Sequence, residues 1–493
     1  MPLTTVPTFR IPPMTAPFRQ LAANGEQDPT ERDTLKLSLG AIGFVLAVGY
    51  AIHVKNGYYA PEALLWLTIG LALLLLSFLL PDVRPSQRTS SRVLAWVLAA
   101  AIVVETLVGL WRATKGVGLL PVFATVVVAV LGLVQLRDWV RLKPLFVALA
   151  VAAFAYTGFY VISLPDPTID VFDWQQQTSL ALTGARNPYL VRIAPRYGKQ
   201  LYPRGTIDEN GYAIYALPYP PLSLLMVLPG FVLGNDVRYA DLFALVVSAV
   251  LMAFARPGRV AALAALLFLL TPRTLYVLWN AWTEPLMVLT FSLVMFCACR
   301  WRSGLPWAFG LFLATKQTTI WAVPLVVLLV EGPNLWKQLL LIALKAGAVV
   351  AVINAPFLLW NVREFVHAVV LLRVVPSFVP YALTYLAWMY RLTGKVPPTW
   401  LGAVLAVAAV VLVLRKAART PAAFAAGVTL VTALFFAFSQ QAFCNYYYFT
   451  IGTACWAIAA ARMPRCDEKE AASCELRPRA CSRNASRDFS KAG

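Results

Sequence analysis

The chain has 493 residues, of which 60% are hydrophobic and only 13% are charged. Soluble domains carry roughly 25% charged residues, so this composition excludes an ordinary soluble protein and indicates an integral membrane protein. The net charge of +19 lies mainly in short loops between apolar segments. That distribution is the positive-inside pattern of membrane proteins, and it argues against a nucleic-acid partner.

Residues 1–34 are polar and lack a cleavable signal peptide, so we expect a disordered cytoplasmic amino terminus. Residues 35–143 are expected to form an amino-terminal group of transmembrane helices. Its apolar segments are 35–54, 62–80, 93–111 and 117–136. Arg and Lys are concentrated in the loops 81–92 and 137–143, which predicts that both loops are cytoplasmic.

Residues 144–462 form the predicted core. Its apolar segments are 144–162, 221–233, 238–255, 259–280, 285–299, 306–330, 339–360, 381–392, 400–414, 422–438 and 446–461. None alternates at period two, so we predict an all-α polytopic membrane protein of roughly 11–14 helices, each needing about 20 apolar residues for a full crossing. The segment 306–330 is interrupted around Lys316. The basic tail, residues 463–493, is expected to be disordered and cytoplasmic.

The polar segment 163–219 is the longest loop of the core, and the charge pattern places it outside the membrane. It carries Asp170 and Asp173 in a chain with only 23 acidic residues. A membrane-surface helix is expected over 174–183, with Asp170 or Asp173 as its N-cap and Gly184 following its end. In the simplest alternative, one aspartate only caps this helix and the other is a solvated loop residue.

Arginines follow the two aspartates in the same loop, among them Arg186, Arg192 and Arg196. Guanidinium groups bind phosphate, although they also anchor proteins to lipid headgroups. A carboxylate can take a proton from an acceptor hydroxyl while cations stabilise a departing phosphate. The combination at a membrane surface is what transfer of a sugar from a lipid phosphate requires.

Several short motifs extend this pattern. They are Asp170 with Gln175-Gln176, Leu180 to Gly184, Asn187-Pro188-Tyr189, Tyr219-Pro220-Pro221-Leu222 with Pro229, Trp282-Thr283-Glu284-Pro285, and Ala314-Thr315-Lys316-Gln317. Together they resemble the multi-spanning C-type glycosyltransferases, most closely glycosyltransferase family 87, over about residues 144–380. The resemblance implies the C-type glycosyltransferase fold, with surface helices on a long first outer loop. It also implies a polyprenyl-phosphate sugar donor, inversion at the anomeric carbon, and Asp170 as the general base.

We therefore predict Asp170 and Asp173 as catalytic residues, Asp173 in a supporting role. The residues expected to bind the donor phosphate are Arg186, Arg192, Arg196, Lys316 and Arg373. The residues expected to line the cavity are Gln176, Asn187, Tyr189, Tyr219, Glu284 and Gln317. Asn445 and the tyrosines from Tyr446 either form an interfacial belt or face a sugar. No cofactor is assigned. A divalent metal at the two aspartates stays open, because two carboxylates alone do not define a site.

The expected function is transfer of a sugar, with mannose favoured, to a cell-envelope glycan or glycolipid at the extracytoplasmic face of a bacterial plasma membrane. The partners are then the lipid-linked donor, the acceptor and membrane lipids. The alternative is a polytopic transporter or lipid flippase. Charged residues within broken apolar helices also occur in those proteins, so this feature does not distinguish them from a transferase. A non-catalytic assembly subunit is a third hypothesis if Asp170 faces bulk water.

Overall fold

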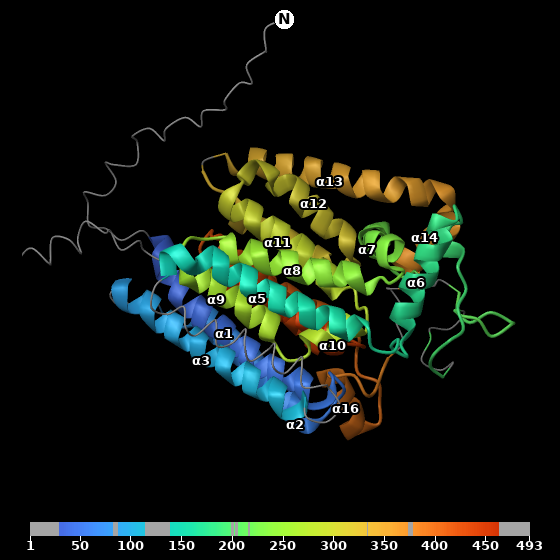
Figure 1. The fold of residues 1–493 in the computed structure, drawn as a ribbon, viewed down its shortest axis with the longest axis horizontal. Coiled ribbons are helices and arrows are strands. Elements are labelled where there is room, and N and C mark those ends of the chain that lie inside the picture. The colour runs from blue at the N-terminus through green and yellow to red at the C-terminus, as the bar shows by residue number, and fades with distance from the viewer. Residues whose placement is uncertain are drawn as a thin grey trace, which may run out of the picture.

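The computed structural model describes residues 29–81, 87–113, 139–198, 202, 206–214, 217–332, 334–372 and 378–462. The predicted segment 117–136, the basic tail and Arg373 lie outside these residues. The described part is all-helical and contains no strand, as predicted. Most helices run side by side in one bundle, with their axes along the long dimension of the molecule (Figure 1).

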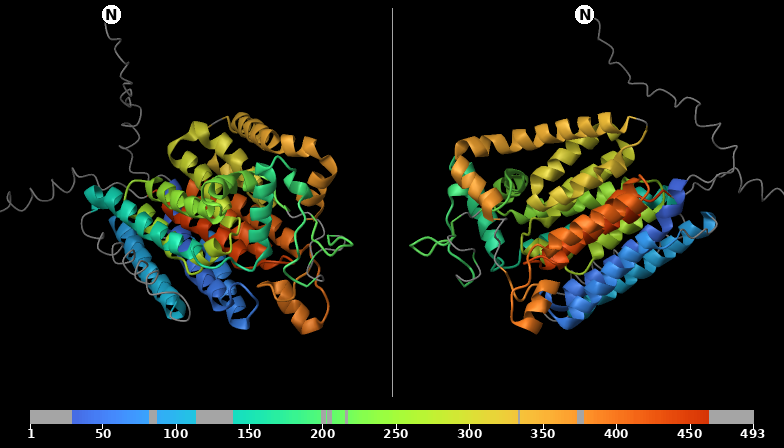
Figure 2. Two further views of the ribbon diagram at one scale, coloured as in Figure 1. Left: turned by 45° about the vertical axis from the view of Figure 1, so that its right-hand side comes forward. Right: turned by 180° about the vertical axis from the view of Figure 1, so that it is seen from behind.

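The amino-terminal helices pack together along one side of the bundle. They are α1 (Pro29–Lys55), α2 (Pro61–Leu79) and α3 (Gln87–Ala113). α1 contacts both of its neighbours and also α19 (Cys444–Ala459) of the core. The amino-terminal group is therefore built onto the core along the length of a helix (Figure 2).

The remaining long helices follow the predicted segments closely. They are α5 (Trp139–Ile162), α7 (Pro221–Gly234), α8 (Arg238–Phe254), α9 (Arg259–Leu270), α11 (Glu284–Arg300), α12 (Leu305–Thr315), α13 (Leu335–Trp360), α17 (Leu401–Lys416) and α18 (Pro421–Ala437). Nearly every residue of α18 and α19 is buried, so these two helices occupy the centre of the molecule.

Two predicted segments are each divided in the structure, one of them unexpectedly. The segment 259–280 was expected to be continuous, but it breaks between α9 and the short α10 (Thr274–Trp279), where Arg273 has a φ of 83°. The segment 306–330 breaks at Lys316, as predicted, and continues as a 3-10 helix, η4 (Gln317–Leu329). Polar residues at helix ends mark both breaks.

Among the described residues, four helical stretches are by themselves long and apolar enough to cross a membrane: Leu35–Lys55, Pro61–Leu79, Lys143–Ile162 and Leu335–Trp360. The pair α7 and α8 is bent by 115° and makes a fifth crossing if it is counted as one span. These lengths indicate a membrane protein. The predicted number of roughly 11–14 also counted shorter helices such as α9 and α18, whose lengths do not meet the same criterion.

Basic residues gather at one end of the bundle, here called the basic end. Lys143 donates hydrogen bonds to the carbonyl oxygens of Arg256 and Gly258, at 3.0 Å each. Arg302 donates to the carbonyl of Leu329 at 3.0 Å, and Arg256 donates to that of Ala460 at 3.4 Å. The loops that carry these residues thus lie at the same end of the bundle.

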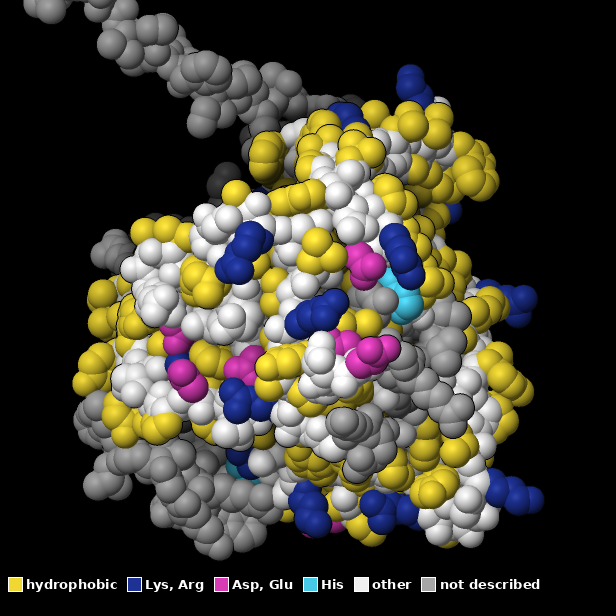
Figure 3. Space-filling model, turned by 90° about the vertical axis from the view of Figure 1, so that its right-hand side faces the viewer, with side chains coloured by type: hydrophobic (Ala, Val, Ile, Leu, Met, Phe, Trp, Pro, Cys, Tyr) yellow, Lys and Arg dark blue, Asp and Glu magenta, His cyan; other side chains and the backbone are white. Residues whose placement is uncertain are grey.

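The opposite end, here called the polar end, carries the short helices. They are α6 (Asp170–Thr183), η1 (Pro188–Leu190), α14 (Val362–Val366), η5 (His367–Leu371) and α16 (Tyr385–Thr393). α6 crosses the ends of the bundle helices instead of running along them (Figure 1). Seen from this end, acidic and basic side chains stand among apolar ones (Figure 3).

Candidate functional site

Helix α6 begins at Asp170, earlier than the sequence predicted. Ile169 occupies the N-cap position with extended backbone, so the expected capping by Asp170 or Asp173 is wrong. Both aspartates instead lie in the first turn, where the helix dipole favours negative charge. At the other end Gly184 has an ordinary φ of −86°, and Ala185 takes the left-handed conformation. The Arg186 amide then donates to the Ala181 carbonyl at 2.8 Å, which closes the helix.

A cavity of about 400 Å³ opens at the polar end beside the start of α6. Its walls come from the α1–α2 turn, the polar loop, the α10–α11 corner, the segment before α16 and the start of α19. The residues with polar or aromatic side chains in these walls are Asn56, Tyr58, Thr168, Asp170, Trp174, Tyr197, Tyr202, Thr206, Tyr219, Tyr276, Trp279, Asn280, Trp282, Tyr381, Gln441, Phe443, Asn445 and Tyr446.

Asp170 is the only charged side chain among the described residues that line this cavity. Burial raises the pKa of its carboxyl group to about 7, an effect that outweighs hydrogen bonds from the backbone amides of α6. Burial, and then the nearby Asp170 charge, also raises the pKa of Tyr197 and Tyr202. A carboxyl group with a pKa near neutrality can both accept and release a proton at physiological pH.

Asp173 faces a different partner, although it is only one turn away from Asp170. Both of its carboxylate oxygens accept hydrogen bonds from the Arg196 guanidinium, one of them at 2.9 Å. This contact raises the pKa of Arg196. With its oxygens so engaged, Asp173 does not fit a metal site shared with Asp170. The described residues also contain no group of three or more side chains suited to hold a metal.

The arginines predicted to bind phosphate lie outside the cavity walls. Arg196 is paired with Asp173, and Arg192 forms an ion pair with Asp208 at 2.9 Å. Arg186 is exposed just after α6. The structure therefore does not bring these three guanidinium groups together around Asp170.

Lys316 and Glu284 form a buried ion pair behind the cavity wall. The Lys316 ammonium donates to a Glu284 carboxylate oxygen at 2.5 Å and to the Thr283 hydroxyl at 3.1 Å. It also lies 5.0 Å from the ring centre of Tyr219 and 5.2 Å from that of Tyr446, and both rings line the cavity. The pair thus lies one layer of side chains away from the space that holds Asp170.

The other predicted cavity residues, apart from Tyr219, bond to the backbone. Asn187 accepts a hydrogen bond from the Tyr189 amide, and the Tyr189 hydroxyl donates to the Tyr219 carbonyl, at 2.9 Å each. The Gln317 amide donates to the carbonyls of Pro218 and Val369 at 3.0 and 2.8 Å. Asn187, Tyr189 and Gln317 hold the cavity wall in place but are not part of it.

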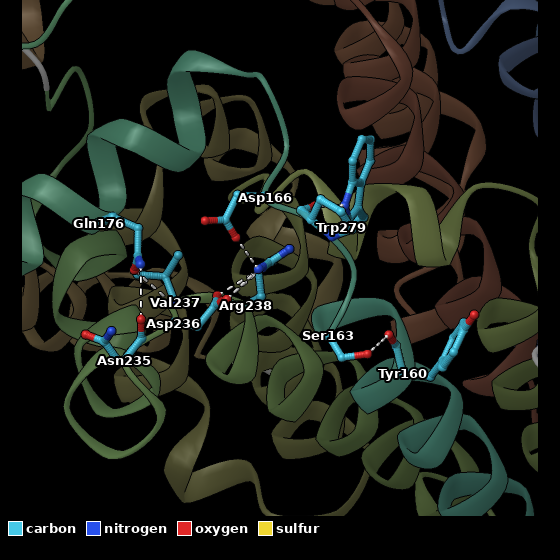
Figure 4. A network of polar contacts seen from close by, with 10 residues as sticks. Tyr160, Ser163, Asp166, Gln176, Asn235, Asp236, Val237, Arg238 and Trp279 are labelled. Atoms are coloured by element: carbon cyan, nitrogen blue, oxygen red, sulfur yellow. Dashed lines mark hydrogen bonds and ion pairs between the residues drawn. The ribbon is translucent and has the colours of Figure 1, made fainter. Parts of the chain in front are cut away.

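Gln176 fastens α6 to the corner between α7 and α8. Its side chain donates to the Asn235 carbonyl at 3.1 Å and accepts from the Val237 amide at 3.2 Å (Figure 4). Next to it, the buried Arg238 guanidinium bonds to Asp236 and, at 2.7 Å, to Asp166 (Figure 4). Sequence reasoning missed this network, because its members are far apart in the chain.

Sequence reasoning also missed the cavity residues contributed by the amino-terminal group and by the segment before α19, notably Asn56, Tyr58 and Gln441. A turn at Asn56-Gly57 is readable from the sequence, but its neighbours in space are not. Asn445 and Tyr446 line the cavity as well. Comparison of the chain with protein-family models, with curated proteins and with solved structures gives no match in any of the three.

Proposed function

We propose that this protein is a membrane glycosyltransferase that moves a sugar from a polyprenyl-phosphate donor to a hydroxyl group of a glycan or glycolipid. The observation that carries the proposal is the position of Asp170. It is the one charged residue among the described walls of a cavity of about 400 Å³, and its pKa is raised to about 7. Reaction at the extracytoplasmic face, the C-type fold and mannose as the sugar belong to the same proposal.

In this mechanism the Asp170 carboxylate removes the proton from the acceptor hydroxyl. The oxygen then attacks the anomeric carbon of the donor sugar from the side opposite the phosphate. The new glycosidic bond forms as the bond to the phosphate breaks, so the configuration inverts and the lipid phosphate leaves. A base with a pKa near the working pH is the most efficient choice for this proton transfer.

The wall chemistry supports a carbohydrate ligand. Aromatic rings, such as those of Trp279 and Tyr381, offer apolar faces, while Asn280 and Asn445 offer amide groups that both donate and accept hydrogen bonds. A small number of polar groups in a mainly aromatic cavity is the usual way to orient a small ligand. The described walls contain no Lys or Arg, so the cation expected to stabilise the leaving phosphate is not among them.

A transporter is the second candidate, because transporter folds also contain broken helices. In this chain the bent pair α7–α8 and the break at Lys316 are of that kind. Transporters bind their substrate near the middle of the membrane, between two halves of the fold. This cavity is instead formed at the ends of helices α1, α6, α10 and α19. Its position therefore favours chemistry at a surface over passage through the bundle.

The test is transfer from radiolabelled polyprenyl-phosphate sugars by the wild-type protein and by Asp170→Asn in membranes. We expect turnover to fall by about 10²- to 10⁴-fold, as is typical for loss of a general base, with donor binding retained. In the wild type, the rate should rise as pH increases through about 7, because only the deprotonated carboxylate accepts a proton.

Glu209→Gln is the matched control, since Glu209 is exposed in the same loop and does not line the cavity. It should leave both turnover and its pH dependence unchanged. Near-normal transfer by Asp170→Asn would rule out Asp170 as the base. A wild-type rate that is flat between pH 5 and 9 would contradict the assigned proton transfer.

A further inference from the structure

The turn between α1 and α2 reaches the cavity, although it belongs to the amino-terminal group. Asn56 and Tyr58 of this turn line the cavity together with Asp170. On the other side of the turn are Tyr381 and Phe443, whose rings lie 5.9 and 5.4 Å from that of Tyr58. The amino-terminal group therefore supplies part of the wall around the proposed reaction site.

The turn is held rigidly against the core. Gly57 has a φ of +77°, and a Cβ atom at this position would lie 2.0 Å from the backbone nitrogen of Cys444. The Tyr59 amide donates to the Tyr381 carbonyl at 2.9 Å, and Arg273 donates to the carbonyl of His53 at 3.0 Å. Backbone contacts on both sides thus fix where Asn56 and Tyr58 point.

Asn56 has an unused hydrogen-bond acceptor. Its side-chain oxygen is buried and has no hydrogen-bond partner among the described residues, and its backbone takes the left-handed conformation with a φ of 55°. A buried acceptor without a donor is unfavourable, so most such groups in proteins are paired. Asn56 also lines the cavity, so a turn of its side-chain amide would bring this oxygen to the cavity surface, where a ligand hydroxyl would supply the donor that the protein lacks.

We propose that the α1–α2 turn is a specificity element for the acceptor, in which Asn56 accepts a hydrogen bond from a sugar hydroxyl and Tyr58 packs against the ring. That the bound sugar is the acceptor rests on the proposed function. The class of ligand follows from the walls: the described lining residues include aromatic and amide side chains but no Lys or Arg. The preferred ligand is therefore an uncharged carbohydrate.

Binding is measured on the full chain in lipid nanodiscs free of sugar-headed detergents, through the fluorescence of the tryptophans at the cavity. Neutral manno-oligosaccharides are compared with uronic-acid oligosaccharides of the same length. The variant is Asn56→Gly, because glycine accepts the left-handed backbone and removes only the side chain. Lys55→Ala is the control, since Lys55 is the exposed neighbour outside the cavity walls.

We expect the wild type to bind the neutral sugars more tightly than the acidic ones. Asn56→Gly should weaken neutral-sugar binding about tenfold, the usual effect of losing one neutral hydrogen bond, while Lys55→Ala changes nothing. Asn56→Asp, which keeps the acceptor oxygen, should bind better than Asn56→Gly. In transfer assays the acceptor KM should rise in Asn56→Gly with the donor KM unchanged.

The inference is overturned if Asn56→Gly binds neutral sugars as the wild type does, if the wild type prefers acidic sugars, or if it binds none of them. Its failure is separable from that of the proposed function. Loss of transfer in Asp170→Asn with unchanged acceptor KM in Asn56→Gly keeps the function and removes this role of the turn. Asn56-dependent sugar binding without transfer from any donor supports the sugar site and removes the transferase.

Discussion

Lys316 and Glu284 carry opposite charges that the fold has removed from both water and lipid. Their side chains are almost completely buried, and one Glu284 oxygen has no hydrogen-bond partner among the described residues. Such pairs contribute little net stability, because removing the charges from water costs about as much as their attraction returns. The position of Lys316 beside the Tyr219 and Tyr446 rings is consistent with a role in shaping the cavity.

At this scale we predict that Lys316→Met lowers the free energy of unfolding by about 3–5 kcal/mol, because it leaves the Glu284 charge buried without its partner. The double variant Lys316→Met/Glu284→Gln should recover most of the loss, since neither position then carries a charge. Thermal unfolding in detergent measures both. The control is Lys395→Met at an exposed position. A single variant no less stable than this control would contradict the prediction.

The two aspartates show what can be predicted at the residue scale. Both aspartates were candidates for catalysis, because they lie beside a membrane span and close to each other in the sequence. Which of them faces a cavity and which pairs with an arginine depended on the path of the loop that returns to α6. Arg196 pairs with Asp173, whereas Tyr197 and Tyr202 line the same cavity as Asp170. Loop paths of this kind leave no periodic signal in the sequence.

Helix bounds were the more predictable feature at the element scale, because apolar length and flanking charge determine them. The exceptions are instructive. The prediction joined α9 and α10 in one segment, although Thr271-Pro272-Arg273 separates them and the chain turns at Arg273 with a positive φ. α12 ends at Lys316, where the charge could be read directly. A charged residue stands at both breaks, so the break between α9 and α10 could also have been read from the sequence.

The α1–α2 turn carries the prediction for this scale. Gly57→Ala should destabilise the protein by more than about 1 kcal/mol, because the new methyl group meets the Cys444 backbone and the φ of +77° disfavours alanine. Gly347→Ala is the matched control. A Cβ there meets nothing within 4 Å, and alanine is the better helix former within α13. Equal unfolding temperatures for the two variants would show that the turn is not held as tightly as described.

The whole molecule is a bundle with two chemically different ends. The basic end carries guanidinium and ammonium groups bonded to helix-end carbonyls, whereas the polar end carries the cavity and most of the short helices. Positively charged loops remain on the cytoplasmic side during membrane insertion. The cavity should therefore open on the opposite side of the membrane.

Cysteine labelling tests this orientation in a variant whose native cysteines are replaced by alanine. Tyr212→Cys lies at the polar end and Arg419→Cys at the basic end, and both positions are exposed. A membrane-impermeant maleimide added to intact cells should label Tyr212→Cys, and should label Arg419→Cys only after the membrane is opened. The reverse pattern would place the cavity in the cytoplasm and contradict the proposed extracytoplasmic reaction.

The sequence by itself determined that this is an all-helical membrane protein, the positions of nearly all of its described helices and the break at Lys316. All of these depend on local hydropathy and charge, which are readable along one segment at a time. Only the tertiary structure decided that Asp170, Asn56, Asn280 and Asn445 share one cavity and that Asp173 does not. The reason is that the cavity is made where the ends of distant helices meet, and long-range packing alone brings those ends together.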